Sequence, residues 1–232
     1  RGADVRIEER PAHELLIFDG QPLVAGAPSG LSARYPSFDM TPAALITHLV
    51  GFDDLYTPES FCRKYQGKVE ADDNQSEASG KYILLYGVPP KSQYSFLLSA
   101  LKADRAESVL VPEMRPQLWG ARVVARDLLE RNVPTTLISD NMMGALFAQG
   151  EILKLCLFYG SLGEAGPTWI CGSLLAVQLA RLHGVPIELF NGDERSDSPL
   201  DSDVSTFMGK KICPAGVAVR SVEEEVVPWG LF

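Results

Sequence analysis

Between residues 82 and 190 the chain alternates short apolar runs with longer amphipathic stretches, and this alternation limits the possible folds more than any other feature. The first run, Tyr82–Tyr86 (YILLY), is apolar throughout, as expected of a strand buried on both faces of a sheet. The stretch that follows it carries apolar residues at helical spacing. Strands alternating with helices predict βαβ units, a parallel sheet and helices on both of its faces. We therefore predict an α/β, Rossmann-like fold for this part of the chain.

The pattern places the secondary structure as follows. The predicted strands of the core are Tyr82–Tyr86, Val109–Val111, Thr135–Ile138, Leu153–Tyr159 and Ile187–Phe190. The predicted helices between them are Ser92–Lys102, Gln117–Arg131, Met142–Gln149 and Ile170–His183. Nearer the ends we predict a helix from Thr41 to Val50, with Thr41 as N-cap and Pro42 as first helical residue, a short helix Pro58–Tyr65, and late strands Val217–Val219 and Val226–Val227.

A polar stretch divides the chain into two parts. Residues 66–80 (QGKVEADDNQSEASG) contain almost nothing apolar and many turn-forming or charged residues, which is typical of a solvated linker. We predict a small N-terminal segment at residues 1–65 and a Rossmann-like core domain at residues 81–232. A second polar stretch, residues 191–203, is expected to form a long loop on the ligand side of the sheet.

Composition excludes several classes of protein. The net charge of -9 argues against binding to nucleic acid, which needs a basic face. No apolar run reaches the roughly 18 residues of a membrane span, and no secretory leader is visible. The four cysteines lack Cys-x-x-Cys spacing, so we predict neither a metal site nor a cofactor, and reduced thiols in a cytoplasmic protein.

Polar residues follow the predicted strands at the edge of the sheet where ligands bind. Glu113 and Arg115 have the chemistry to bind sugar hydroxyls and a phosphate, although a mutual ion pair that orders the loop explains them equally well. Asp140 and Asn141 begin a predicted helix, so an N-cap role for Asp140 competes with acid–base chemistry. Residues 160–166 lack phosphate-loop spacing and are better explained as a turn.

Three segments identify a resemblance to a known family. Glu113–Arg122 (EMRPQLWGAR) resembles the motif ETRPxxxGAR, Val133–Met142 (VPTTLISDNM) resembles IPVTLITDNM, and His183–Pro186 (HGVP) resembles HGIP. Ala148–Gly150 follows at the expected distance. These motifs are similar to those of the family that unites 5-methylthioribose-1-phosphate isomerase with the alpha, beta and delta regulatory subunits of initiation factor 2B.

The resemblance also predicts a loss of chemistry. Isomerases of the family convert a cyclic aldose 1-phosphate to a ketose 1-phosphate with a cysteine after the first core strand and an aspartate after the fourth. Here the first position falls in a loop containing Val88 and the second falls on Gly160, and neither residue transfers protons. The resemblance therefore implies a pocket that binds without converting. The expected ligand-binding residues are Glu113, Arg115, Gln117, Asp140 and Asn141.

The N-terminal residues resemble the family's chain-closing segments. Val5–Pro11 (VRIEERP) and Tyr35–Thr47 (YPSFDMTPAALIT) are similar to motifs that end the family's chains, yet here they open the chain. A circular permutation and a fragment joining the tail of one unit to the core of the next both account for this order.

Three functions follow as hypotheses. The first is a non-catalytic, assembly-forming domain that binds a sugar phosphate or nucleotide and, as the resemblance implies, forms a homodimer. The second is an aldose–ketose isomerase using displaced groups, for which Asp140 with Glu113 or Asp193 are the best catalytic candidates. The third is a pure protein-interaction module whose pocket is closed by Trp119 and Trp169.

Overall fold

The computed structural model describes residues 7–24, 31–51, 54–65, 80–193 and 203–232, and a six-stranded parallel sheet lies at its centre. In space the strands follow the order β12, β9, β6, β7, β8, β3. Their bounds are β3 (Ser32–Ala33), β6 (Tyr82–Tyr86), β7 (Ser108–Pro112), β8 (Thr135–Ile138), β9 (Ile152–Tyr159) and β12 (Ile187–Asn191). Neighbouring strands of this sheet all pair in parallel, which confirms the predicted α/β fold.

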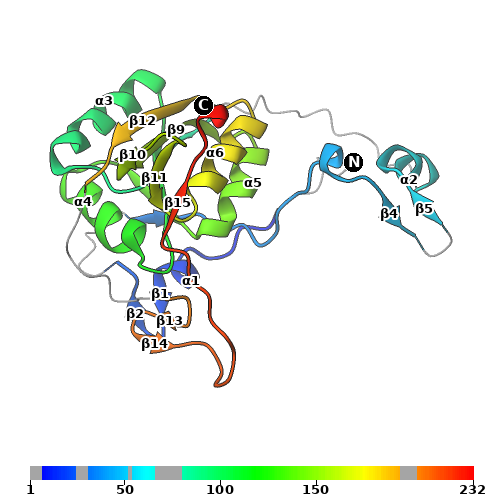
Figure 1. Ribbon diagram of the computed structural model, residues 1–232, viewed down its shortest axis with the longest axis horizontal. Helices are drawn as coiled ribbons and strands as arrows, with labels where there is room; N and C mark the ends of the chain where they lie inside the picture. The colour runs from blue at the N-terminus through cyan, green and yellow to red at the C-terminus, as the bar shows by residue number, and fades with distance from the viewer. Residues whose placement is uncertain (1–6, 25–30, 52–53, 66–79, 194–202) are drawn as a thin grey trace.

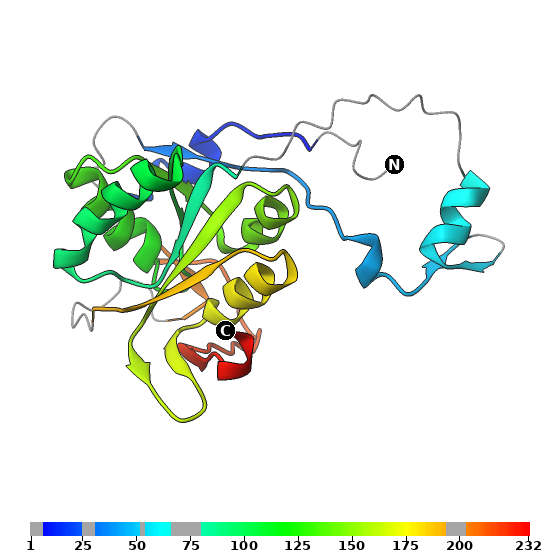
Figure 2. The same ribbon diagram turned by 90° about the horizontal axis from the view of Figure 1, so that it is seen from above.

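Helices cover both faces of the sheet (Figures 1 and 2). One face carries α3 (Tyr94–Asp104) and α4 (Ala125–Glu130), and the other carries α5 (Met143–Ala148) and α6 (Ser173–Leu182). Every residue of β6 and of β7 is buried as a result. This two-sided covering is the physical reason why these strands read as continuous apolar runs rather than alternating patterns.

Two predicted helices begin later than expected. The stretch Gln117–Arg131 starts with a turn in which Leu118 has a φ of 60°, and becomes helical only at Gly120, with a π-helical turn (η4, Gly120–Val124) before α4. Residues from Ile170 first complete strand β11 (Pro167–Ile170), and α6 starts at Ser173. The Glu225 carboxylate accepts the backbone N–H groups of Gly172 and Leu174 at 2.7 and 2.8 Å, which caps that later start.

The C-terminal residues add a second, antiparallel sheet. β10 (Ser161–Leu162) pairs with β11, which pairs with β15 (Glu224–Val226). Residues 160–166 thus include the first strand of a hairpin and the turn that follows it, rather than a phosphate loop. The late strand near Val226 is present, whereas the predicted strand Val217–Val219 was wrong, because these residues are exposed and pair with no strand among the described residues. Most of the expected 191–203 loop lies outside the described residues.

The N-terminal segment packs against the core and extends its sheet. Strand β3 pairs with β8, and the hydroxyl of Ser32 lies 2.8 Å from that of Thr136. Arg34 reaches Glu151 of the core at 2.6 Å and also pairs with Glu9. Pairing with Glu9 and Glu151 offsets the free-energy cost of partly burying the charge of Arg34. Strand pairing and ion pairs therefore both attach the N-terminal segment to the core.

Two short hairpins lie beside each other at one end of the core (Figure 1). The first consists of β1 (Ile17–Phe18) and β2 (Gln21–Pro22), preceded by helix α1 (His13–Leu16), and the second of β13 (Thr206–Phe207) and β14 (Lys210–Lys211). The rings of Phe18 and Phe207 meet edge to face with centroids 4.7 Å apart. Lys210 pairs with Asp19 across the same contact.

Residues 43–51 and 54–65 form an arm that extends away from the body (Figures 1 and 2). It comprises a 3-10 turn η2 (Ala43–Leu45), the hairpin of β4 (Leu49–Val50) with β5 (Leu55–Tyr56), and α2 (Pro58–Tyr65). The short helix at Pro58–Tyr65 is confirmed. The prediction of a helix from Thr41 to Val50 was wrong, because these residues pack on no core and an isolated helix of this length is marginal in water.

Within the described residues, no helix combines the length and the apolar character that crossing a membrane requires. All four cysteines are free thiols. Burial raises the pKa of Cys156 to about 12, so this thiol stays protonated and packs as a small apolar side chain.

Candidate functional site

The loop after β7 presents two charged residues at the carboxyl edge of the sheet. Glu113 is only 8% exposed, and Arg115 is half-buried beside it. Met114 between them has a φ of 57°, a left-handed backbone conformation that is costly for a residue with a side chain. Such a conformation persists only where the surroundings hold it in place.

Asp140, at the end of the adjacent strand β8, supplies that support. Its two carboxylate oxygens accept the backbone N–H groups of Met114 and Arg115 at 2.8 and 2.7 Å. The 3-10 turn η5 (Asp140–Met142), which follows β8, has no side-chain cap. Asp140 therefore caps the neighbouring loop rather than its own helix. Burial raises its pKa, and the two backbone donors act in the opposite direction.

The carboxyl group of Glu113 has a pKa raised well above that of an ordinary glutamate. The pKa of its carboxyl group is raised from 4.5 to about 8, chiefly by burial and also by the nearby Asp140, while Arg115 acts in the opposite direction. In the part of the chain that the structure describes, no hydrogen bond or ion pair engages this carboxyl group. A largely protonated Glu113 at neutral pH can both donate and accept a hydrogen bond.

The sequence left two explanations open for Arg115 and Glu113, ligand binding or a mutual ion pair. In the structure Arg115 forms no ion pair with Glu113. Its guanidinium donates to the carbonyl of Thr206 at 3.1 Å and lies over the ring of Phe207, 4.6 Å from the centroid. Stacking on an aromatic face leaves other donors of the guanidinium fork for an anion.

These residues line a cavity of about 360 Å³. Its polar wall holds Glu113 and Arg115 together with Ser139 and Asn141, which share a hydrogen bond of 2.5 Å. The remaining lining residues are Glu14, Leu15, Phe18, Tyr35, Met142, Phe207 and Ile212. One side is thus polar and the other mainly apolar, which is typical of a site for a small organic molecule.

The structure brings together most of the residues predicted from sequence. Glu113, Arg115 and Asn141 line the cavity, while Asp140 lies behind the loop and Gln117 lies outside the lining. Neither Asp193, Trp119 nor Trp169 belongs to it.

Sequence reasoning missed the opposite wall, which comes from α1, the β1 hairpin and the β13 hairpin. No motif marks these residues, because they meet the core only in the folded chain.

The place where open parallel sheets most often bind ligands is filled in this protein. The strand order changes direction between β6 and β9, and ligands bind at such a switch point in related architectures. Here the indole of Trp169 occupies the space beside Gly160, where a Cβ would lie 2.0 Å from the ring. The free cavity lies instead beside β7 and β8.

Comparison with known proteins agrees with the fold. Residues 71–157 match the model of the initiation factor 2 subunit family. The methylthioribose-1-phosphate isomerase of Syntrophotalea carbinolica is 32% identical over 170 residues, covering 67% of this chain and 46% of that enzyme. The corresponding enzyme of Trichlorobacter lovleyi is 32% identical over 144 residues, covering 56% of this chain and 41% of that enzyme. This chain thus spans less than half the length of these curated relatives.

Two solved structures share the architecture. The 5-methylthioribose 1-phosphate isomerase of Pyrococcus horikoshii OT3 superposes with a TM-score of 0.54 and 22% identity, covering 66% of this chain and 48% of that one. Subunit delta of the translation initiation factor eIF-2B from A. fulgidus superposes with a TM-score of 0.53 and 18% identity, covering 66% and 50%. At these identities the likeness establishes the fold alone.

Proposed function

Because the chain belongs to the initiation factor 2 subunit family, we propose that its cavity binds a small phosphate-bearing sugar or a nucleotide without converting it. The observation that carries this proposal is the polar wall of the cavity. Arg115 offers a forked cation for a phosphate, and Glu113 and Asn141 offer donors and acceptors for hydroxyl groups. The volume of about 360 Å³ lies within the usual range for small-molecule sites.

The absence of conversion rests on the two positions that depart from the family pattern. In the alignment of the motifs, the aspartate expected after the fourth strand of the core becomes Gly160, and Trp169 fills the space beside it. The loop that would carry the cysteine holds Gly87 and Val88. Neither position supplies a group that transfers a proton.

A thermal-shift comparison with Arg115→Ala tests the proposal. Ribose 5-phosphate, 5-methylthioribose 1-phosphate and adenosine monophosphate are added separately to the wild-type protein and to the variant. A ligand at 100 times its Kd is expected to stabilise the wild type by about 2.7 kcal/mol. We expect the variant to lose most of this stabilisation, because the phosphate loses its charged partner.

The matched control is Arg126→Ala, since Arg126 lies on α4 and does not line the cavity. It removes the same charge and is expected to retain the full shift. Equal shifts in both variants would place binding elsewhere on the protein. No shift with any of the three compounds would overturn the proposal and leave a protein-interaction function.

A second candidate function, aldose–ketose isomerisation, is favoured by one observation. Glu113 combines burial, a pKa raised to about 8 and a position in the cavity wall, which are properties of a group that transfers protons near neutral pH. Turnover of 5-methylthioribose 1-phosphate by the wild type, lost in Glu113→Gln while binding persists, would support it. Binding without turnover would reject it and leave the first proposal intact.

A further inference from the structure

A second cavity lies between the two hairpins and the body. Its volume is about 230 Å³, and it adjoins the Glu113 cavity described above, because Phe18 lines both. We call it the hairpin cavity. Two of its lining residues are cations, in a chain whose net charge is -9. Besides Phe18, the lining residues are Gln21 and Pro22 of β2, Arg122 of η4, and Met208 and Lys210 of the second hairpin.

Arg122 is held in place by the packing of η4 on the core. Gly120 of this turn lies so close to β7 that a Cβ would meet the carbonyl oxygen of Pro112 at 1.8 Å, and Ala121 is fully buried. Arg122 itself is half-buried, and its guanidinium forms neither a hydrogen bond nor an ion pair within the residues that the structure describes. Partly burying a charge costs free energy unless a partner compensates, so an anion beside Arg122 would be stabilising.

The other walls of the hairpin cavity are made by two turns of the same kind. The two-residue turns Asp19–Gly20 and Met208–Gly209 connect the strands of the two hairpins. All four turn residues have a positive φ, between 47° and 77°, as in the type I′ turns that suit such short connections. The residue directly after each turn, Gln21 in one hairpin and Lys210 in the other, lines the cavity. Tight turns therefore position both side chains.

Lys210 has a partner that binds it only weakly. Its ammonium pairs with Asp19 of the other hairpin, and the two side chains are 52% and 61% exposed. An ion pair this exposed contributes little to stability, because water screens both charges. Lys210 can therefore bind an anion in the cavity at small cost, whereas the negative charge of Asp19 opposes that binding.

We propose that the hairpin cavity binds a phosphate-sized oxyanion between Arg122 and Lys210. The guanidinium offers two parallel donors, the ammonium a compact charge, and the amide of Gln21 a further N–H donor. The anion joins the body to both hairpins, since Arg122 belongs to the body and the other two residues to separate hairpins. The same hairpins carry Phe18 and Phe207 of the Glu113 cavity, so the anion also fixes the outer wall of that cavity.

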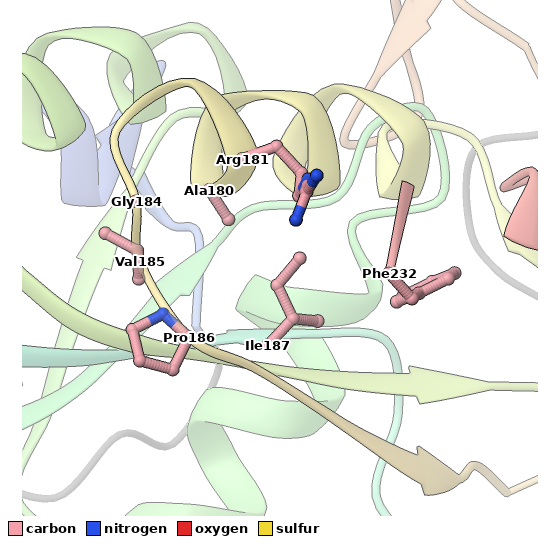
Figure 3. Close-up of a pocket in the computed structure, with 7 residues that line it drawn as sticks. All are labelled: Ala180, Arg181, Gly184, Val185, Pro186, Ile187 and Phe232. Atoms are coloured by element: carbon pink, nitrogen blue, oxygen red, sulfur yellow. The ribbon is translucent and has the colours of Figure 1, made fainter. Parts of the chain in front are cut away.

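Calorimetric titration of the full chain with inorganic phosphate tests the proposal. We expect Arg122→Gln to weaken the phosphate Kd about tenfold or more, the scale of a lost hydrogen bond to a charged group. Lys210→Gln should weaken it by a smaller factor, because this ammonium is more exposed to water. The matched control is Arg181→Gln, an arginine that lines a different cavity together with Ile187 and Phe232 (Figure 3). It removes the same charge and should leave the Kd unaltered.

Asp19→Asn should change the affinity in the opposite direction. Asparagine adopts the left-handed turn conformation readily, so the hairpin keeps its shape. Removal of the carboxylate releases Lys210 and ends the repulsion of the anion. We expect the phosphate Kd to tighten roughly threefold, the scale of one exposed charge interaction. This variant tests the site even if Arg122→Gln fails to fold, and an unchanged or weaker Kd would contradict the proposal.

Two further results would overturn the proposal. One is a wild type that binds no phosphate, or whose Kd is unaltered by Arg122→Gln. The other is binding lost in Arg115→Ala and retained in Arg122→Gln, since phosphate would then occupy the Glu113 cavity. Binding that requires Arg122 and not Arg115 supports the hairpin cavity even if the Glu113 cavity binds no ligand. A parallel titration with glycerol 3-phosphate distinguishes the free ion, if it binds more weakly, from the phosphoryl group of a larger molecule, if it binds more tightly.

Discussion

Replacing Asp140 by alanine is expected to lower the unfolding free energy by about 3–6 kcal/mol, the scale of two lost hydrogen bonds to a charged acceptor. The same change should abolish ligand binding in the cavity. The two N–H groups that Asp140 accepts belong to Met114 and Arg115, and these hydrogen bonds help to hold Met114 in its left-handed conformation. The loop would then relax and carry both Glu113 and Arg115 out of the cavity wall.

Urea denaturation of the wild type, Asp140→Ala and Asp140→Asn measures this effect. Asparagine keeps one acceptor oxygen of similar shape, so Asp140→Asn should retain about half of the stability that alanine loses. A relaxed loop also predicts that both variants lose thermal shifts with phosphate compounds that the wild type shows. If Asp140→Ala were as stable as the wild type, the two hydrogen bonds to Asp140 would contribute nothing to stability. The position of Glu113 would then need another explanation.

Glu113→Gln is expected to stabilise the protein at high pH and to leave it almost unchanged at low pH. The carboxyl group has a pKa of about 8 in the folded protein, against an ordinary value of 4.5. Between these values the unfolded chain releases a proton that the folded chain keeps, so stability falls as pH rises from 4.5 to 8. Glutamine cannot ionise and removes this loss, which amounts to about 3–5 kcal/mol at about 1.4 kcal/mol per pKa unit.

Unfolding free energies of the wild type and Glu113→Gln at several values between pH 5 and pH 9 test this expectation. The two curves should diverge as pH increases, with the variant above the wild type. Asp140 also has a raised pKa and remains in both proteins, so part of the wild-type slope should persist in the variant. Parallel curves would mean that Glu113 is not buried in a form that resists ionisation.

The core of the fold could be predicted because local pattern and tertiary environment agree there. Tyr82–Tyr86 and Thr135–Ile138 are strands with the predicted bounds, since strands covered on both faces leave continuous apolar runs in the sequence. The helix predicted from Thr41 to Val50 failed for the opposite reason. Its cap and its propensity are local signals, and no packing partner is present on the body to stabilise a helix there.

The candidate site could be predicted only in part. Glu113, Arg115 and Asn141 were expected to lie close together because β7 and β8 are neighbours whose carboxyl ends meet at one edge. The role of Asp140 was not visible, since its partners are backbone groups 25 and 26 residues away rather than its own helix. Phe18 and Phe207 were missed because residues so distant in sequence meet only through the packing of two hairpins.

The edge strand β3 gives folding a long-range step. Ser32 bonds to Thr136 across a separation of 104 residues, and the chain between them includes β6, β7 and the helices α3 and α4. Loops of this size close slowly, because the chain loses conformational entropy before the contact adds any stabilising free energy. On a ribosome the first forty residues emerge well before β8 exists to receive them. We therefore expect the cavity wall contributed by α1 and the β1 hairpin to assemble only after β8 has been made, so that a newly made chain spends that interval with Leu15 and Phe18 uncovered.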